Sequence, residues 1–128
     1  MQSLEQIRAA GALKAAGAKK TNGKPLFSRA DVAGLPALIL SNGLLSAVAF
    51  ACEKDKDTRA GMNAACEATA KHLALNIHGI SVLRSVADGT QLVSALSKDP
   101  ATSLDVQRAT AESLAFLSYL KRFAEPAE

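Results

Sequence analysis

The side chains capable of acid–base, metal or nucleophilic chemistry are few in this chain and lie scattered along it. Its 128 residues include two cysteines, two histidines and twelve carboxylates. Cys52 and Cys66 occur in alanine-rich sequence, where a thiol packs as a small apolar group, and a zinc site needs more ligands at closer spacing. His72 and His78 are six residues apart, which is about 600° around a continuous helix. The sequence therefore predicts that the two imidazoles point in different directions.

No local motif for enzymatic chemistry is present. The chain has no P-loop, no dinucleotide-binding glycine fingerprint and no G-x-S-x-G nucleophile elbow. Glu53, Asp55 and Asp57 alternate with lysines, which is typical of a solvated connector, and they lack the spacing of an EF-hand calcium loop. These observations predict a protein that is not an enzyme and that holds no metal or cofactor.

Positive charge is concentrated in the first quarter of the chain. The net charge is only +3, yet residues 1–30 carry six Lys or Arg and one acid, whereas the remainder carries nine basic and eleven acidic residues. A local positive field suits a polyanion such as RNA or an acidic protein surface. A solvated helix end with a lysine-rich loop explains the same pattern without any ligand, so charge alone leaves these alternatives open.

The elements that must position these residues are predicted to be helices. Alanine supplies 26 of the residues, aromatics make up 4%, and tryptophan is absent. Because alanine is the best helix former and a poor strand former, the composition argues strongly against an all-β sandwich. The longest apolar run, residues 35–40, is far shorter than the roughly 20 residues that cross a bilayer, and no signal peptide is visible. We predict one all-α domain over residues 1–128, a compact bundle of about five to six helices without a sheet, in the cytoplasm.

Capping residues and helix breakers set the expected helix boundaries. Ser3 and Gln6 fit a capping box, and the helix that they begin is expected to reach about Lys19. A short helix is predicted over 28–34, capped by Ser28. Further helices are expected over 36–52 (apolar on nearly every face, with Gly43 as a kink or a close contact), 58–78, 80–86, 90–97 and 104–124.

Three segments in this order resemble one protein family across nearly the whole chain. They are LEQIRAA at 4–10, LPALILSNGL at 35–44, and ATAE at 109–112 followed by YLKRFA at 119–124. The second is fairly specific, since Asn-Gly inside an apolar helix is uncommon, and Tyr119 stands where the family often has tryptophan. The chain resembles the small all-helical subunit of the Cmr complex, the RNA-targeting CRISPR effector of type III-B systems.

The resemblance implies an all-α, non-enzymatic subunit without a cofactor that serves in antiviral defence. Copies of such subunits stack into a short filament beside a second filament of larger backbone subunits, which hold the guide RNA and cleave the target. The small subunits line the channel that target RNA occupies. The implied partners are the backbone subunit, the large polymerase-like subunit, further copies of the chain, guide RNA and target RNA, and the isolated chain is expected to be monomeric.

Three roles remain open from the sequence. In the first, the guide supplies sequence recognition, so the subunit need only contact phosphate and sugar, and the scarcity of aromatics disfavours a base-stacking platform. In the second, the chain is a structural spacer whose ends meet the next copy, with 120–124 at the joint. In the third, it is an unrelated helical nucleic-acid regulator. The candidate RNA contacts are Arg8, Lys14, Lys19, Lys20, Lys24 and Arg29, followed by Arg108, Lys121 and Arg122; Arg8 is also a candidate for a salt bridge.

Overall fold

The computed structural model describes residues 2–53 and 57–126. In these two ranges the regular secondary structure is helical, and no β-strand is present. Six α-helices are present there, which confirms the all-α prediction and the expected number of helices. They are α1 (Leu4–Gly17), α2 (Arg29–Asn42), α3 (Leu44–Ala51), α4 (Ala60–Leu73), α5 (Gly89–Leu96) and α6 (Ser103–Phe123). Single 3₁₀ turns form η1 (Asp57–Arg59), η2 (Asn76–His78) and η3 (Ser81–Leu83).

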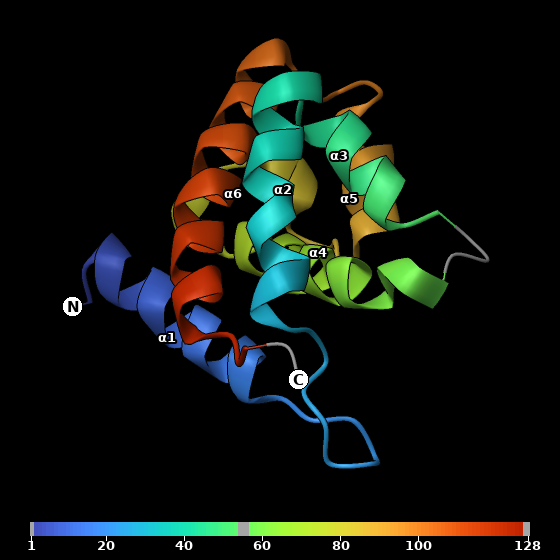
Figure 1. Ribbon diagram of the computed structural model, residues 1–128. Helices are drawn as coiled ribbons and strands as arrows, with labels where there is room; N and C mark the ends of the chain where they lie inside the picture. The colour runs from blue at the N-terminus through green and yellow to red at the C-terminus, as the bar shows by residue number, and fades with distance from the viewer. Residues whose placement is uncertain (1, 54–56, 127–128) are drawn as a thin grey trace.

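The longest helix, α6, is the element against which most others pack. It runs beside α2 in the opposite direction, and α1 crosses it near its C-terminal end (Figure 1). Helix α4 contacts α6 from behind and also contacts α1, α2 and α5. The large side chains that these helices and η3 bury completely are Val32, Leu35, Leu73, Leu83, Leu92, Phe116 and Leu120.

The first two helices begin where their capping residues predict. Ser3 Oγ accepts from the Gln6 backbone N–H at 3.1 Å, and the Ser3 N–H donates to Gln6 Oε1 at 2.6 Å. Ser28 and Asp31 form the same reciprocal pair at the start of α2. These side chains satisfy N–H groups that the first turn of a helix leaves without partners, so each start is fixed locally.

The prediction that the first helix reaches Lys19 is wrong by two residues. Ala18 takes an extended conformation, and the backbones of Lys19 and Pro25 pair in an isolated bridge. Within this turn the Lys20 N–H donates to the Lys24 carbonyl at 2.7 Å. The polar turn thus supplies backbone hydrogen bonds that compete with the last turn of the helix.

The apolar region 36–52 is two helices, and the first begins at Arg29 instead of Pro36. Pro36 lies inside α2, where it removes one backbone hydrogen bond, but Leu35 and Ile39 on either side of it are buried. The continuous helix expected over 36–52 is wrong because Gly43 has φ of 89° and ψ of 159°. That region of backbone conformation is accessible essentially to glycine alone, and it ends α2 and begins α3.

The helix predicted over 58–78 is also wrong in its extent. It ends at Leu73, Leu75 is extended, and η2 then carries the chain to Gly79, whose φ is 68°. The helix predicted over 80–86 is only the single turn η3. In the charged connector, Lys54, Asp55 and Lys56 lie outside the described residues. The early end of α4 allows the chain to fold back beside it.

Candidate functional site

Basic residues from both ends of the chain meet at the lower end of the molecule in Figure 1. There the C-terminal end of α1, the turn that follows it, the start of α2 and the end of α6 lie together. Arg29, Ser118, Lys121 and Arg122 line a surface hollow of about 500 Å³. We call these four residues the basic hollow. Its three cations are separate candidates in the sequence, and the fold brings them together.

The C-terminal segment holds Arg29 in place at the rim of the basic hollow. The Arg29 backbone N–H donates to the Glu125 carbonyl at 2.8 Å, and Arg29 Nη2 donates to the Ala124 carbonyl at 3.1 Å. Because both contacts are with backbone carbonyls, the charge of Arg29 is not neutralised by them. Within residues 2–53 and 57–126, no carboxylate lies in salt-bridge range of the three cations of the basic hollow.

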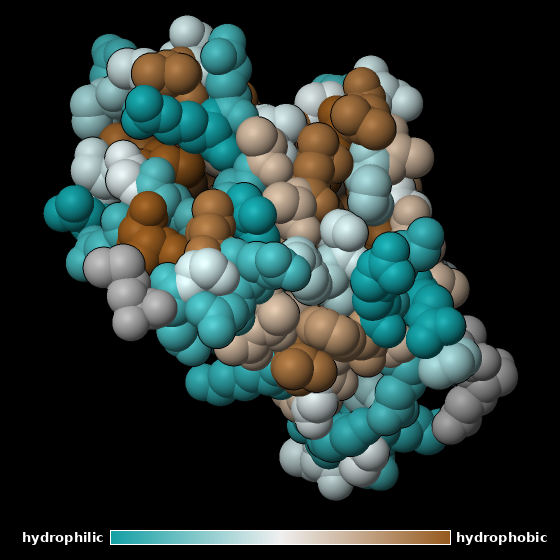
Figure 2. Space-filling model, turned by 90° about the vertical axis from the view of Figure 1, so that its left-hand side faces the viewer, coloured by the Kyte–Doolittle hydropathy of each residue, from teal (hydrophilic) through white to brown (hydrophobic). Residues whose placement is uncertain are grey.

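Four further candidates lie near the same end but do not line the basic hollow, namely Lys14, Lys19, Lys20 and Lys24. Lys19 Nζ pairs with Glu125 Oε1 at 2.9 Å, and both side chains are exposed. Lys20 and Lys24 are exposed in the turn that follows α1, where Figure 2 shows hydrophilic residues gathered at the lower end of the face it presents. Lys14 is exposed on the last turn of α1. These residues extend the positive surface beyond the basic hollow.

Arg108 is the candidate that the structure separates from the others. It is exposed near the beginning of α6, fourteen residues before Arg122. At 1.5 Å per residue, the two side chains leave the helix about 21 Å apart along its axis. Arg108 and the basic hollow therefore cannot contact the same phosphate.

Arg8 forms an ion pair with a buried carboxylate, that of Glu112. Its Nε donates to Glu112 Oε2 at 2.8 Å, and its Nη2 donates to Glu112 Oε1 at 2.7 Å, which is a bidentate pair joining α1 to α6. The Glu112 side chain is 10% exposed and that of Arg8 is 24% exposed. The salt bridge that the sequence left open for Arg8 is thus present, with a partner 104 residues away.

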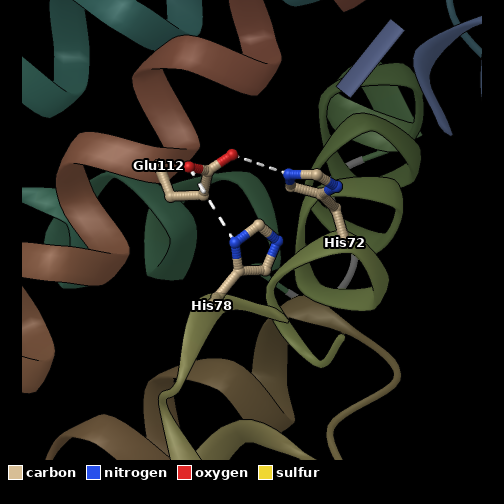
Figure 3. A group of neighbouring side chains, drawn as sticks. All are labelled: His72, His78 and Glu112. Atoms are coloured by element: carbon tan, nitrogen blue, oxygen red, sulfur yellow. Dashed lines mark hydrogen bonds and ion pairs between the residues drawn. The ribbon is translucent and has the colours of Figure 1, made fainter. Parts of the chain in front are cut away.

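The two histidines complete this buried cluster, and the prediction that they point in different directions is wrong. Because α4 ends at Leu73, η2 returns His78 to the neighbourhood of His72, and their ring centroids are 4.5 Å apart. His72 Nε2 lies 2.8 Å from Glu112 Oε2, and His78 Nδ1 lies 3.9 Å from Glu112 Oε1 (Figure 3). The His72 ring also stacks on Phe116 with a centroid distance of 4.3 Å.

Burial and charge act in opposite directions on the pKa values in this cluster. Burial alone raises the pKa of Glu112, but hydrogen bonds from Arg8 and His72 outweigh it, and the pKa is lowered. Burial lowers the pKa of His72, and the hydrogen bond with Glu112 offsets this only in part. Burial likewise lowers the pKa of His78. At neutral pH the cluster is one cation, one anion and two neutral imidazoles.

The cysteines serve as packing groups between α3, α4 and α5. Cys66 is buried, as predicted, and Cys52 is half-buried with its Sγ donating to Asn63 Oδ1 at 3.3 Å. The side chain of Cys52 and the Cβ of Cys66 both lie against Gly89, at the beginning of α5. The hydrogen bond with Cys52 and burial together raise the pKa of the Cys66 thiol, which keeps it protonated.

Comparison with known protein families identifies the family of this chain. The model of the family described as CRISPR-associated protein (Cas_Cmr5) matches residues 4–127. The chain belongs to the Cmr5 family. Cmr5 is the small-subunit family of the Cmr complex, so the resemblance drawn from three short segments is confirmed, and membership implies assembly with other Cmr subunits. No curated protein and no solved structure matches the chain.

Both the basic hollow and the buried cluster lie within the part of the chain that matches Cmr5. None of the helices in the described residues is long and apolar enough to cross a membrane. Among the cations of the basic hollow, only Arg29 lies in the segment with the excess of positive charge, whereas Lys121 and Arg122 were second candidates from the C-terminal part of the chain. Glu112 and the histidine pair were not predicted, because nothing near each residue in the sequence signals that they meet.

Proposed function

We propose that this Cmr5 protein is a non-catalytic subunit that holds target RNA in the Cmr complex through sequence-independent contacts with its sugar–phosphate backbone. The observation that carries the proposal is the basic hollow, where three cations without an acidic partner in the described residues converge beside a hydroxyl group. Its volume of about 500 Å³ leaves room for a phosphodiester group and its two riboses. The hollow is lined by no aromatic side chain of the described residues on which a base would stack.

The chemistry of the basic hollow suits phosphate and does not suit base recognition. Arg29 and Arg122 each present a planar fork of N–H donors that matches two phosphate oxygens, and Lys121 adds a point charge. Ser118 can donate a hydrogen bond to phosphate or accept one from a ribose 2′-hydroxyl. Phosphate and sugar contacts position a nucleic acid without reading its sequence, which is the division of labour expected when a guide RNA supplies base pairing.

In the proposed arrangement, copies of the subunit stack along the backbone filament, and each places its basic hollow on the channel that holds target RNA. Lys20 and Lys24, exposed in the neighbouring turn, extend the positive surface along the strand. Cleavage belongs to another subunit. Among the described residues, no histidine, cysteine or carboxylate lines the hollow. This supports a binding role, because histidine and the carboxylates are the side chains that most often supply acid–base or metal-binding groups for backbone cleavage.

The test is charge reversal at the hollow in the assembled complex. The variant Lys121→Glu/Arg122→Glu is expected to weaken target-RNA capture at least tenfold. The slope of log affinity against log salt should fall by about 1.4, which is about 0.7 for each of two phosphates that the subunit no longer neutralises. The matched control is Arg84→Glu/Lys98→Glu, which reverses two exposed charges outside the hollow and should leave the slope nearly unchanged. Equal slopes for the two variants, with both complexes intact, would refute RNA binding at the basic hollow.

A structural spacer is the second candidate function, and exposed apolar residues favour it. Leu40 is 75% exposed and Leu104 is 49% exposed, and both lie at the end of the molecule opposite the basic hollow, near the end of α2 and the start of α6 (Figure 1). The contact with the next copy predicted at 120–124 differs from this, because Leu120 and Ala124 are buried within the chain and their side chains cannot contact another subunit. If Leu40→Ser/Leu104→Ser abolishes assembly while the charge-reversal variant retains RNA, the spacer role stands alone.

A further inference from the structure

We propose that His72, His78 and Glu112 form a binding site for a divalent transition-metal ion, and that Zn²⁺ is the ion the site fits best. The proposal is independent of RNA binding, since none of these residues lines the basic hollow. Two imidazoles and one carboxylate are a donor set that zinc uses with an open fourth position. Mg²⁺ and Ca²⁺ prefer all-oxygen ligands, which makes them poor competitors here.

The three donor atoms already lie close to the separations that a metal requires. All of them are within 4.8 Å of one another, with 2.8 Å from His72 Nε2 to Glu112 Oε2 and 3.9 Å from His78 Nδ1 to Glu112 Oε1. Ligands of a tetrahedral zinc ion are about 3.3 Å apart when each bond is about 2.0–2.1 Å. One observed separation is shorter than this value and another is longer, so side-chain rotation within the existing fold is enough to form the site.

The fold holds the three ligands from three different segments. His72 comes from α4, His78 from η2 and Glu112 from α6, and their side chains converge in Figure 3. Stacking on Phe116 fixes the plane of the His72 ring, and the His78 ring meets it edge-on at 60°. Ligands that are already oriented lose less conformational freedom when the ion binds. A site that bridges α4, η2 and α6 also stabilises the folded chain when occupied.

Metal binding requires a proton to move on the His72 imidazole. The hydrogen bond to Glu112 places a proton on Nε2 of His72, and the metal takes that position while the proton moves to Nδ1 of the same ring. His72 Nδ1 and His78 Nε2 have no hydrogen-bond partner in the described structure, so no other contact opposes the change of tautomer. A metal-bound histidine usually donates its second N–H to an acceptor, and the lack of one among the described residues predicts a weaker site than a structural zinc centre.

Arg8 is the group that opposes the metal, and this gives the proposal its most specific consequence. Its guanidinium contacts both oxygens of Glu112, so a metal ion must share the carboxylate with a cation or displace it. The Arg8 side chain is 24% exposed, which allows it to turn toward solvent. Removing the positive charge should therefore strengthen metal binding, although the same change weakens the ion pair that holds α1 on α6.

The experiment titrates the full chain, without an affinity tag, with Zn²⁺ by calorimetry and with Co²⁺ by visible absorption. We expect one ion per chain and an intense visible cobalt spectrum of a four-coordinate site. His78→Gln removes the ligand that lies 3.9 Å from Glu112, beyond hydrogen-bond distance of that carboxylate, and it should lower the zinc affinity at least tenfold. Arg8→Gln should raise the affinity by about tenfold, because a unit positive charge beside the ion is removed.

The controls separate the proposed site from other metal-binding groups. A near-ultraviolet thiolate-to-cobalt absorption band would place the ion at a cysteine and overturn the proposal, and Cys52→Ser should leave binding unchanged. Absence of saturable binding, equal affinity in His78→Gln, or weaker binding in Arg8→Gln would each overturn it as well. Circular dichroism of every variant checks folding. If His78→Gln does not fold, the direction of the Arg8→Gln effect still decides the question.

Discussion

Loss of the negative charge on Glu112 should cost this protein a large part of its stability. Glu112→Gln keeps the shape of the side chain but leaves the Arg8 guanidinium without its counter-charge. Breaking a fully buried ion pair by removing one partner costs about 3–5 kcal/mol. Because Arg8 is 24% exposed, water compensates part of this loss, and we expect a cost of about 2–3 kcal/mol. For a chain of this length, that corresponds to a fall in the unfolding temperature of roughly 10 °C.

The reverse substitution should cost less, which tests whether the stability comes from the pair or from the carboxylate. Arg8→Met leaves Glu112 hydrogen-bonded to His72 at 2.8 Å, and protonation of His72 can supply the missing positive charge. We expect a cost of about 1–2 kcal/mol. In a double-mutant cycle with Glu112→Gln, the coupling between the two positions should exceed about 1 kcal/mol, because each single variant removes the same interaction.

Urea unfolding followed by the helical circular dichroism signal measures these free energies, with a chelator present to keep trace metal from contributing. Glu67→Gln is the matched control: Glu67 pairs with Lys71 at 3.5 Å on the surface of α4, and exposed pairs of this kind contribute about 0.3–0.5 kcal/mol. If Glu112→Gln loses no more stability than Glu67→Gln, or if the cycle is additive, the buried cluster does not hold α1 on α6.

Three further outcomes follow from the structure and are read by the same unfolding assay. Stability should fall as the pH is lowered from about 7. Because the pKa of His72 is lowered in the folded chain, the unfolded chain binds a proton at this residue at a higher pH than the folded chain does. The lowered pKa of Glu112 has the same effect at more acidic pH, so the loss of stability continues there. Gly43→Ala should cost roughly 1–3 kcal/mol, since its φ of 89° strains any other residue. Leu35→Ala, at a side chain 1% exposed, should cost about 2–5 kcal/mol, whereas Leu40→Ala should change stability by less than about 0.5 kcal/mol.

The starts of α1 and α2 were predictable from the sequence because their determinants are local. Ser3 with Gln6, and Ser28 with Asp31, satisfy the first N–H groups of α1 and α2 from within four residues. Helix ends were predicted less well, because they depend on what the following residues do. Residues 36–52 illustrate the limit: their composition correctly indicates apolar, helical chain, but the backbone angles of Gly43 divide it, and composition carries no information about those angles.

The basic hollow was predictable as a set of residues but not as a site. All three cations were candidates from the sequence: Arg29 lies in the positively charged first 30 residues, and Lys121 and Arg122 were named after it as adjacent bases near the end of the last predicted helix. Their convergence depends on the antiparallel course of α2 and α6, which brings the start of one helix beside the end of the other. Nothing in the sequence indicates that Lys19 is paired with Glu125, so the cations could not be ranked by how freely they reach a phosphate.

The histidine pair shows why a helical-wheel argument fails at a helix end. The 600° separation of His72 and His78, about 100° for each of six residues, holds only if the helix continues, and α4 ends one residue after His72. The decisive element is the turn through η2, which Gly79 closes with φ of 68°. Both histidines then face a carboxylate that lies 40 residues beyond His72 in the chain. Burial keeps solvent away from the two imidazoles. Their protonation, and their affinity for a metal ion, therefore depend on Glu112 and Arg8 rather than on the residues adjacent in sequence.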